Sequence, residues 1–397
     1  MIAITGIGAI MPNGTGRAAF LASLGSAGGW ISGGEDFGGS LPEPRSLGRV
    51  RNFQPKDYIP AMKARRMSRF SQLALCSAIE AVQDAGLRIA DENRLRCGVA
   101  VGTGIASTSS TDSFYEGLLR EGPEGTNPMV FPETVQNIAA AHIGMHFTIT
   151  GPNITFSQTD ISSELALSYA CGLLAAGAYD CFIVTGADEL SPSLVIGYDA
   201  LGLLADRMLP YGSDRAGFVP AEGAATLVLE RTEDARRRGA KVYAEVAGVC
   251  FSSSPVQGIG YDESGRSMAG ALRSAAAALG GALPGFIVAC ANSSRALDRL
   301  ECGALREVFG PDCRVPVRPL RGLYGYFPSD GMARIAAAAL CIAEGIVPAG
   351  LEPGGPVSGG GCLPLPSGGT ASSPETAIVN SFSAGGSAAA TVLRRPA

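Results

Sequence analysis

The stretch Ala221-Glu-Gly-Ala-Ala-Thr-Leu-Val-Leu-Glu-Arg231 returns in altered form near the C-terminus as Ala384-Gly-Gly-Ser-Ala-Ala-Ala-Thr-Val-Leu-Arg-Arg395. In both copies small residues lead into a short apolar run that ends at arginine, and an aromatic residue, Phe218 or Phe382, lies just upstream. Self-similarity within one chain indicates a duplicated structural unit. We therefore predict two halves, residues 1–235 and 236–397, which meet near the charged stretch Arg231–Lys241.

Short apolar runs rich in valine and isoleucine alternate with longer stretches rich in alanine and leucine. The short runs fit buried strands, and the longer stretches have helical spacing. Such alternation is typical of an α/β fold with parallel strand pairing. The predicted strands are Ile2–Ile7, Arg96–Val101, Cys181–Gly186, Ala224–Glu230, Lys241–Val249, Gly285–Cys290, Thr376–Val379 and Ala389–Leu393, the predicted helices include Arg69–Ala85, Ser162–Ala178, Arg266–Leu279 and Gly331–Glu344, and the predicted long loops are Gly25–Pro44 and 350–374.

Composition argues against several classes of function. The net charge is −5, so we expect neither a nucleic acid nor a membrane as partner. The basic segment Lys63–Arg69 fits a local patch or the solvated start of a helix equally well. No apolar run is long enough to cross a bilayer, and the chain starts without a charged leader. The ten cysteines form no Cys-x-x-Cys pair, so we expect no zinc ribbon. Because the cysteines are scattered along the chain, we expect reduced thiols and a cytoplasmic protein.

An ordered set of motifs covers nearly the whole chain. The set comprises Ile4-Thr-Gly-Ile-Gly-Ala9, Met11-Pro-Asn-Gly14, Met67–Phe70, Gly102-Thr-Gly104, Gly151–Phe156, Ile183–Glu189, Asp214–Phe218 with Glu222-Gly223, and Asn380–Gly386. In this order the motifs resemble those of the β-ketoacyl synthases. The resemblance implies an α/β thiolase-like fold with two pseudo-duplicated βαβαβαββ halves in a five-layered α-β-α-β-α arrangement.

The same resemblance assigns the catalytic positions. In that family a cysteine thiolate at a helix N-terminus accepts the acyl group, and two histidines stabilise the enolate formed by decarboxylation. The cysteine position, nine residues after Gly151, holds Asp160, and the two histidine positions hold Cys290 and Tyr326. Arg321 stands where the family has a lysine. A carboxylate is a poor acyl acceptor, so the resemblance implies a chain that has lost its catalytic residues.

Two of these positions allow alternative interpretations. Asp160 fits the N-cap of the following helix, which we favour because Ser162, Ser163 and Glu164 come next, and its charge would also block acyl loading. Cys290 fits a small buried thiol in the space of an imidazole, which we favour over a displaced nucleophile.

The chain contains only two histidines, His142 and His146, four residues apart on one predicted helix. This spacing can bind a metal, but the sequence suggests no third ligand. We therefore predict no metal site and assign the pair a role in packing or in an interface.

The resemblance also implies a role beside an active partner. The region from Arg321 to Pro348 is similar to the second half of chain-length factors, the ketosynthase beta subunits of bacterial type II polyketide synthases. Such a subunit forms a heterodimer with an active ketosynthase and shapes the acyl tunnel. It needs no cofactor of its own, because the acyl carrier protein delivers its phosphopantetheine to the partner. By count after the Gly-Thr-Gly turn, the candidate gating residues are Thr108, Thr111, Phe114 and Tyr115.

Other functions remain open at this stage. Those factors commonly carry glutamine where Asp160 stands, so an aromatic and a polyene polyketide system are both compatible with the sequence. The alternatives to a length-setting subunit are an active acyltransferase or ketosynthase that uses Cys290, and a scaffold that only stabilises its partner.

Overall fold

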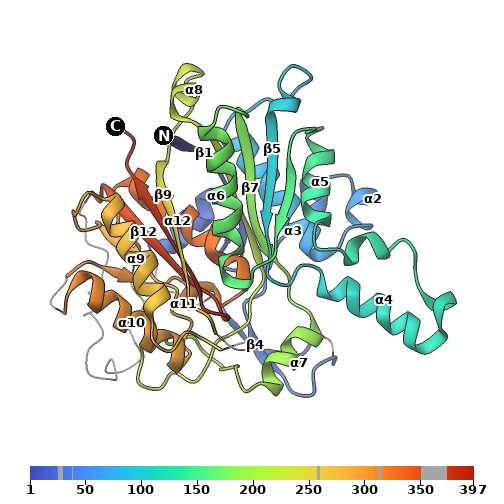
Figure 1. Cartoon of the computed structure of the whole chain (residues 1–397). Helices are drawn as coiled ribbons and strands as arrows, with labels where there is room; N and C mark the ends of the chain where they lie inside the picture. The colour runs from blue at the N-terminus through green and yellow to red at the C-terminus, as the bar shows by residue number, and fades with distance from the viewer. Residues whose placement is uncertain (26–29, 38, 257–259, 312–313, 350–372) are drawn as a thin grey trace.

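The computed structural model of this chain describes residues 1–25, 30–37, 39–256, 260–311, 314–349 and 373–397. Its main sheet has the strand order β11-β10-β12-β13-β9-β1-β8-β7-β5-β6, with the short β2 paired to β1 (Figure 1). The strands of this sheet are β1 (Ile2–Met11), β2 (Gly14–Thr15), β5 (Cys97–Gly102), β6 (Asn153–Phe156), β7 (Cys181–Asp188), β8 (Gly223–Arg231), β9 (Ala244–Ser253), β10 (Phe286–Val288), β11 (Val317–Arg318), β12 (Thr376–Phe382) and β13 (Ser387–Arg394).

The strand order reads the same from either end of the sheet. Apart from β2, each half contributes five described strands. From the outer edge to the centre, these are the third, second, fourth, fifth and first strands of that half in chain order. The three outer strands of each half pair in parallel, whereas β8 and β13 pair antiparallel with both of their neighbours. This topology confirms the predicted βαβαβαββ duplication, and the two similar stretches of sequence form β8 and β13. The predicted boundary at residue 235 stays a prediction.

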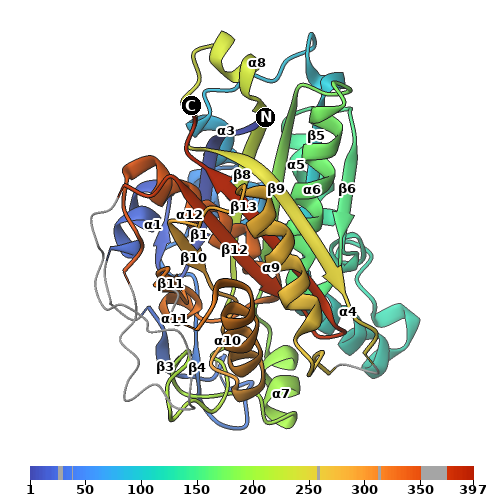
Figure 2. The same ribbon diagram turned by 60° about the vertical axis from the view of Figure 1, so that its left-hand side comes forward.

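Helices form three layers around these strands. On the outside, α3 (Arg69–Asp84) and α5 (Ile138–His146) pack on the N-terminal strands, while α9 (Arg266–Ala278) contacts the C-terminal strands and α10 (Arg295–Phe309) packs on α9 (Figure 2). Between the two halves lie α6 (Ser162–Ala175) and α12 (Gly331–Glu344), each of which contacts strands of both halves. The result is the predicted five-layered thiolase-like arrangement.

Small residues allow the central helices to approach the strands closely. A Cβ atom on Gly102 would lie 2.5 Å from the carbonyl carbon of Ser162, and α12 is buried from Gly331 to Ile342. Because six of the fourteen residues of α12 are alanine, the strands on either side can close over it. In contrast, Gly172 and Ala175 in the last turns of α6 are exposed.

The two halves of the sheet join through a short seam. Antiparallel pairing between β1 and β9 covers only Ile2–Ile4 and Ala244–Val246. The central helices therefore carry most of the contact between the halves.

The remaining elements connect or cover these layers. The predicted loop Gly25–Pro44 contains a strand, β3, which pairs with β4, whereas residues 350–372 of the second predicted loop lie outside the described residues. In the described part of the chain, no helix combines the length and apolar character needed to span a bilayer. The other elements are α1 (Arg17–Leu24), β3 (Ser32–Glu35), β4 (Arg45–Leu47), α2 (Ala61–Ala64), α4 (Thr108–Glu121), α7 (Pro192–Ala200), α8 (Thr232–Arg237), α11 (Arg321–Tyr324) and the 3-10 turns η1 (Pro55–Asp57), η2 (Arg94–Arg96), η3 (Pro123–Gly125), η4 (Phe131–Thr134), η5 (Thr159–Ile161) and η6 (Pro328–Asp330).

Candidate functional site

Asp160 lies in η5, the tight turn that joins β6 to α6. The carboxylate does not cap α6, contrary to our expectation, because the N-cap residue is Ile161 and no side-chain cap bond forms. Instead, Asp160 is buried and its Oδ1 accepts a hydrogen bond from Arg321 Nη2 at 3.3 Å. Burial raises the pKa of Asp160 to about 6, although the charge of Arg321 and a hydrogen bond from Tyr326 oppose the shift. The orientation of the Asp160 carboxylate is therefore explained by its ion pair with Arg321 and not by capping of α6.

Arg321 occupies the centre of the site. Its guanidinium has no exposed surface and binds both carboxylate oxygens of Asp330, with Nε–Oδ2 at 2.6 Å and Nη2–Oδ1 at 2.8 Å. Nη1 donates to the backbone carbonyl of Cys290 at 2.5 Å. Burial disfavours the charged form, but Asp330 and Asp160 raise the pKa of Arg321 well above its usual value. The guanidinium therefore remains charged and connects η5, η6 and the segment after β10.

Cys290 follows β10 and is fully buried in the C-terminal core. Its backbone N–H donates to Glu301 Oε1 at 2.8 Å, and Asn380 Nδ2 lies 3.6 Å from its Sγ. Burial and the nearby Glu301 raise the pKa of this thiol well above its ordinary value. Because the thiolate is the nucleophilic form, the surroundings of Cys290 favour an inert thiol.

Tyr326 places its ring against the guanidinium of Arg321. The Arg321 guanidinium carbon lies 4.8 Å from the ring centroid, a cation–π distance, and the Phe218 ring lies 4.5 Å from the same ring. Burial and the nearby Asp160 raise the pKa of the phenol well above its usual value. The structure thus brings Asp160, Cys290 and Tyr326 together around one arginine.

Asp330 and Arg334 belong to the same buried charge network as Arg321 but were not predicted as site residues. Asp330 also accepts from Arg334 Nε at 3.1 Å, and Arg334 Nη2 donates to Ser381 Oγ at 2.8 Å. Ser381 in turn donates to Glu164, whose pKa burial raises. A signal was present in the sequence, because Asp330 and Arg334 stand four residues apart at the start of an otherwise apolar helix.

The candidate gating residues lie on α4, which extends from the body of the molecule and contacts η4 and α7 (Figure 1). The Thr108 hydroxyl is buried and has no hydrogen-bond partner among the described residues, whereas Thr111 donates to the Ser107 carbonyl at 3.0 Å. Phe114 is half-buried and packs 5.5 Å from the Phe131 ring, and Tyr115 is exposed. The first turn of α4 therefore faces the protein, and its later turns face outward.

The two histidines lie apart from this site. His142 Nε2 is 2.6 Å from Glu133 Oε1, near the start of α3, and the His146 ring packs on Phe147. Burial and the nearby Lys63 lower the pKa of His146. Among the described residues, no group of three histidine, cysteine or acidic side chains is arranged to hold a metal ion.

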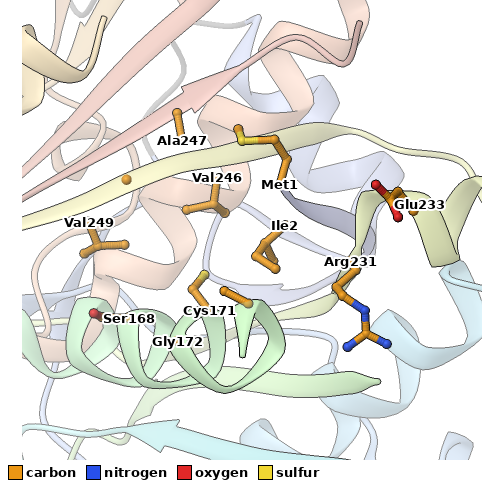
Figure 3. A pocket seen from close by; sticks show the side chains of 12 residues that line it. Met1, Ile2, Ser168, Cys171, Gly172, Arg231, Glu233, Val246, Ala247 and Val249 are labelled. Atoms are coloured by element: carbon orange, nitrogen blue, oxygen red, sulfur yellow. The ribbon is translucent and has the colours of Figure 1, made fainter. Parts of the chain in front are cut away.

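A separate cavity of about 560 Å³ opens between α6 and β9. Figure 3 shows Ile2, Val246 and Val249 facing Cys171 on α6, with Arg231 at one end. None of the candidate site residues lines this cavity. It lies along the flank of α6 that the fold leaves partly uncovered.

Comparisons with known proteins agree with this architecture. The family model "Beta-ketoacyl synthase, N-terminal domain" matches residues 1–235. The 3-oxoacyl-[acyl-carrier-protein] synthase 2 of Vibrio cholerae is 29% identical over 409 residues, covering 99% of each chain. The granaticin polyketide putative beta-ketoacyl synthase 1 of Streptomyces violaceoruber is 30% identical over 366 residues, covering 87% of each chain.

A solved structure, "the ishigamide ketosynthase/chain length factor", superposes with a TM-score of 0.90 at 23% identity, covering 100% of this chain and 99% of that one. The duplicated fold and the family model together define a protein of the thiolase-like ketosynthase fold. This chain belongs to the β-ketoacyl synthase family.

Proposed function

We propose that this chain is a non-catalytic ketosynthase-like subunit that pairs with an active ketosynthase and sets the length of a polyketide chain. The observation that carries the proposal is Arg321, whose buried guanidinium fills the space between Asp160, Cys290 and Tyr326. Those three residues stand at the positions that the family resemblance assigns to the nucleophile and the two histidines. A site filled by ion pairs and without an imidazole has no general base or enolate-stabilising donor of the usual kind.

The alternative of an active enzyme that uses Cys290 receives less support. The Cys290 thiol has no exposed surface, and its pKa is raised by burial. An acyl group could reach this sulfur only if the core around β10 and β12 opened.

Exposed apolar side chains support a partner subunit. On α4 and the segment after it, Tyr115 is 55%, Leu119 82%, Met129 63% and Phe131 54% exposed, and we name these four residues the α4 patch. Clusters of exposed aromatic and aliphatic side chains are typical of protein–protein interfaces. The similarity to a ketosynthase/chain length factor structure makes an active ketosynthase the proposed partner. By the same resemblance, the acyl carrier protein would load that partner.

The test is reconstitution with an active ketosynthase, an acyl carrier protein and malonyl units, followed by mass analysis of the products. Thr108→Trp and Thr111→Trp should shorten the product at unchanged complex formation, because an indole fills space at the first turn of α4. Ser274→Trp, on the exposed face of α9, serves as the control.

Each other outcome has a defined meaning. If the tryptophan variants formed the complex but left product length unchanged, the subunit would be a scaffold that only stabilises its partner. Chain elongation by this polypeptide alone, with an acyl group found on Cys290 by intact mass, would establish the active-enzyme alternative.

A further inference from the structure

Two consecutive carboxylates at the end of β7 organise the turn between β5 and α4. Asp188 Oδ1 accepts hydrogen bonds from Thr103 Oγ1 at 2.7 Å and from the backbone N–H groups of Gly104, Ile105 and Ala106 at 3.0, 2.8 and 3.1 Å. Ala106 adopts a left-handed conformation, with φ of 61°. Several amides converging on one buried acceptor can hold such a strained turn.

Glu189, the next residue, binds two helices at once. Its carboxylate has no exposed surface. Oε2 accepts from the Phe70 N–H at 2.7 Å, and Oε1 accepts from Ser109 N–H at 2.7 Å and from Ser109 Oγ at 2.5 Å. Phe70 and Ser109 are the second residues of α3 and α4, so one carboxylate satisfies free N–H groups at both helix N-termini.

The N-terminus of α4 depends on this contact more than that of α3 does. The N-cap Ser68 of α3 accepts from Ser71 N–H, and Glu133 accepts from Ser68 N–H at 2.9 Å. The N-cap Ser107 of α4 makes no side-chain cap bond, and no residue of α4 is fully buried. The charged acceptor Glu189 therefore supplies the cap that α4 lacks.

We propose that Glu189 is a positioning residue that fixes the first turn of α4 and thereby the wall of the acyl tunnel. Thr108 and Thr111 flank Ser109 on that turn, so the two carboxylate–Ser109 bonds hold the candidate gating residues in place. This inference rests on the proposed function, and it assigns a length-determining role to a residue that does not touch the product.

The first measurement is hydrogen–deuterium exchange of the assembled complex at pH 8. Burial raises the pKa of Glu189 to about 7, so the carboxylate is ionised at this pH. Glu189→Gln keeps the shape of the side chain but replaces one acceptor by a donor. We expect exchange at residues 108–112 to accelerate about tenfold, the effect of losing one charged helix cap. Glu189→Ala should produce at least as large a change.

The second measurement is the product-length distribution of the same complexes. Glu189→Gln should spread the products over more chain lengths, with turnover and complex formation retained. The matched control is Glu133→Gln, which changes a buried carboxylate whose hydrogen bonds go to Ser68, Ser71 and His142 and not to α4. Glu133→Gln should leave both the exchange of α4 and the product distribution unchanged.

Contrary outcomes separate this inference from the proposed function. Unchanged α4 exchange in Glu189→Gln would overturn the inference, whatever the tunnel variants do. An equal broadening of product length by Glu133→Gln would also overturn it. A third contrary outcome combines both measurements. If Glu189→Gln accelerated α4 exchange but left product length unaffected, while Thr108→Trp shortened the product, the inference would again be overturned. If product length stayed fixed in both of these variants while α4 exchange rose, the proposed function would fail instead.

Discussion

Arg321 shows how one residue can hold the candidate site together. Its guanidinium binds Asp330 through two hydrogen bonds, approaches Asp160 and stacks on Tyr326, all without exposed surface. Replacing one member of a buried ion cluster leaves the other charges without compensation, and this usually costs more than the cluster contributes. We therefore expect the arginine to be needed for stability.

We expect Arg321→Met to lower the free energy of unfolding by about 3–5 kcal/mol, because Asp330 and Asp160 would stay buried with less compensating charge. Urea denaturation followed by circular dichroism measures the change. As a control, Arg273→Met breaks the exposed Arg273–Glu307 pair and should cost less than about 1 kcal/mol. Equal losses in the two variants would contradict the structural role of Arg321.

Asp160 should make stability depend on pH. The pKa of its carboxyl is about 6 in the folded chain, above its ordinary 3.8. A group whose pKa rises on folding favours the folded state most at low pH, and that contribution is lost as the pH increases through the folded pKa. The stability of the unmodified chain, measured relative to that of Asp160→Asn, should therefore fall by about 2–3 kcal/mol between pH 4 and pH 7.5.

Denaturation curves of both proteins at several pH values test this expectation. A stability difference that stays constant, or that grows with pH, would show that Arg321 compensates the Asp160 charge fully.

At the scale of single residues, the sequence predicted which positions form the candidate site but not which side chains they contact. Asp160, Cys290 and Tyr326 were singled out by motif spacing, and the structure places them around one arginine. The expectation of an Asp160 helix cap was wrong, because Arg321, 161 residues away in the chain, competes for the carboxylate. Local capping rules carry no information on such long-range charge pairs.

Among the secondary-structure elements, those with long apolar patterns were predictable. The ten residues of β1 are all buried, although the strand continues to Met11, past its predicted end at Ile7, and α3 and α12 follow their predicted bounds within a residue. The short edge strand β11 has only two residues, too few to show a period, and the strand β3 was hidden in a glycine-rich segment. Tertiary pairing rather than local pattern defines these elements.

Close contact between β5 and α6 gives a prediction for Gly102. An added Cβ would lie 2.5 Å from the backbone of Ser162, where no flexible side chain can move aside. We expect Gly102→Ala to lower the free energy of unfolding by about 1–3 kcal/mol, the cost of overpacking.

Gly303 provides the matched control in the same measurement. It lies on the exposed face of α10, and an added Cβ there meets open space. Gly303→Ala should stabilise the chain by up to about 1 kcal/mol through helix propensity. Destabilisation by both substitutions to a similar extent would argue against tight α6–β5 packing.

For the molecule as a whole, the α4 patch gives the prediction about association. Leu119→Asp should weaken binding to the partner ketosynthase by about tenfold or more, because a buried carboxylate without a partner is costly at an interface. Size-exclusion chromatography and titration of the purified subunits measure the affinity of the complex. Leu283→Asp, at a site 60% exposed in the C-terminal half, should leave binding unchanged. Intact association in Leu119→Asp would place the interface elsewhere.

The symmetric strand order makes the two repeats depend on each other. Each half covers one side of its own central helix, and strands of the other half contact the second side, over α12 more extensively than over the partly exposed α6. A free polypeptide with one such repeat would leave an apolar helical flank in water, so it would have to associate with a second copy. In the present chain both repeats belong to one polypeptide, so each supplies apolar contacts that the other would otherwise lack.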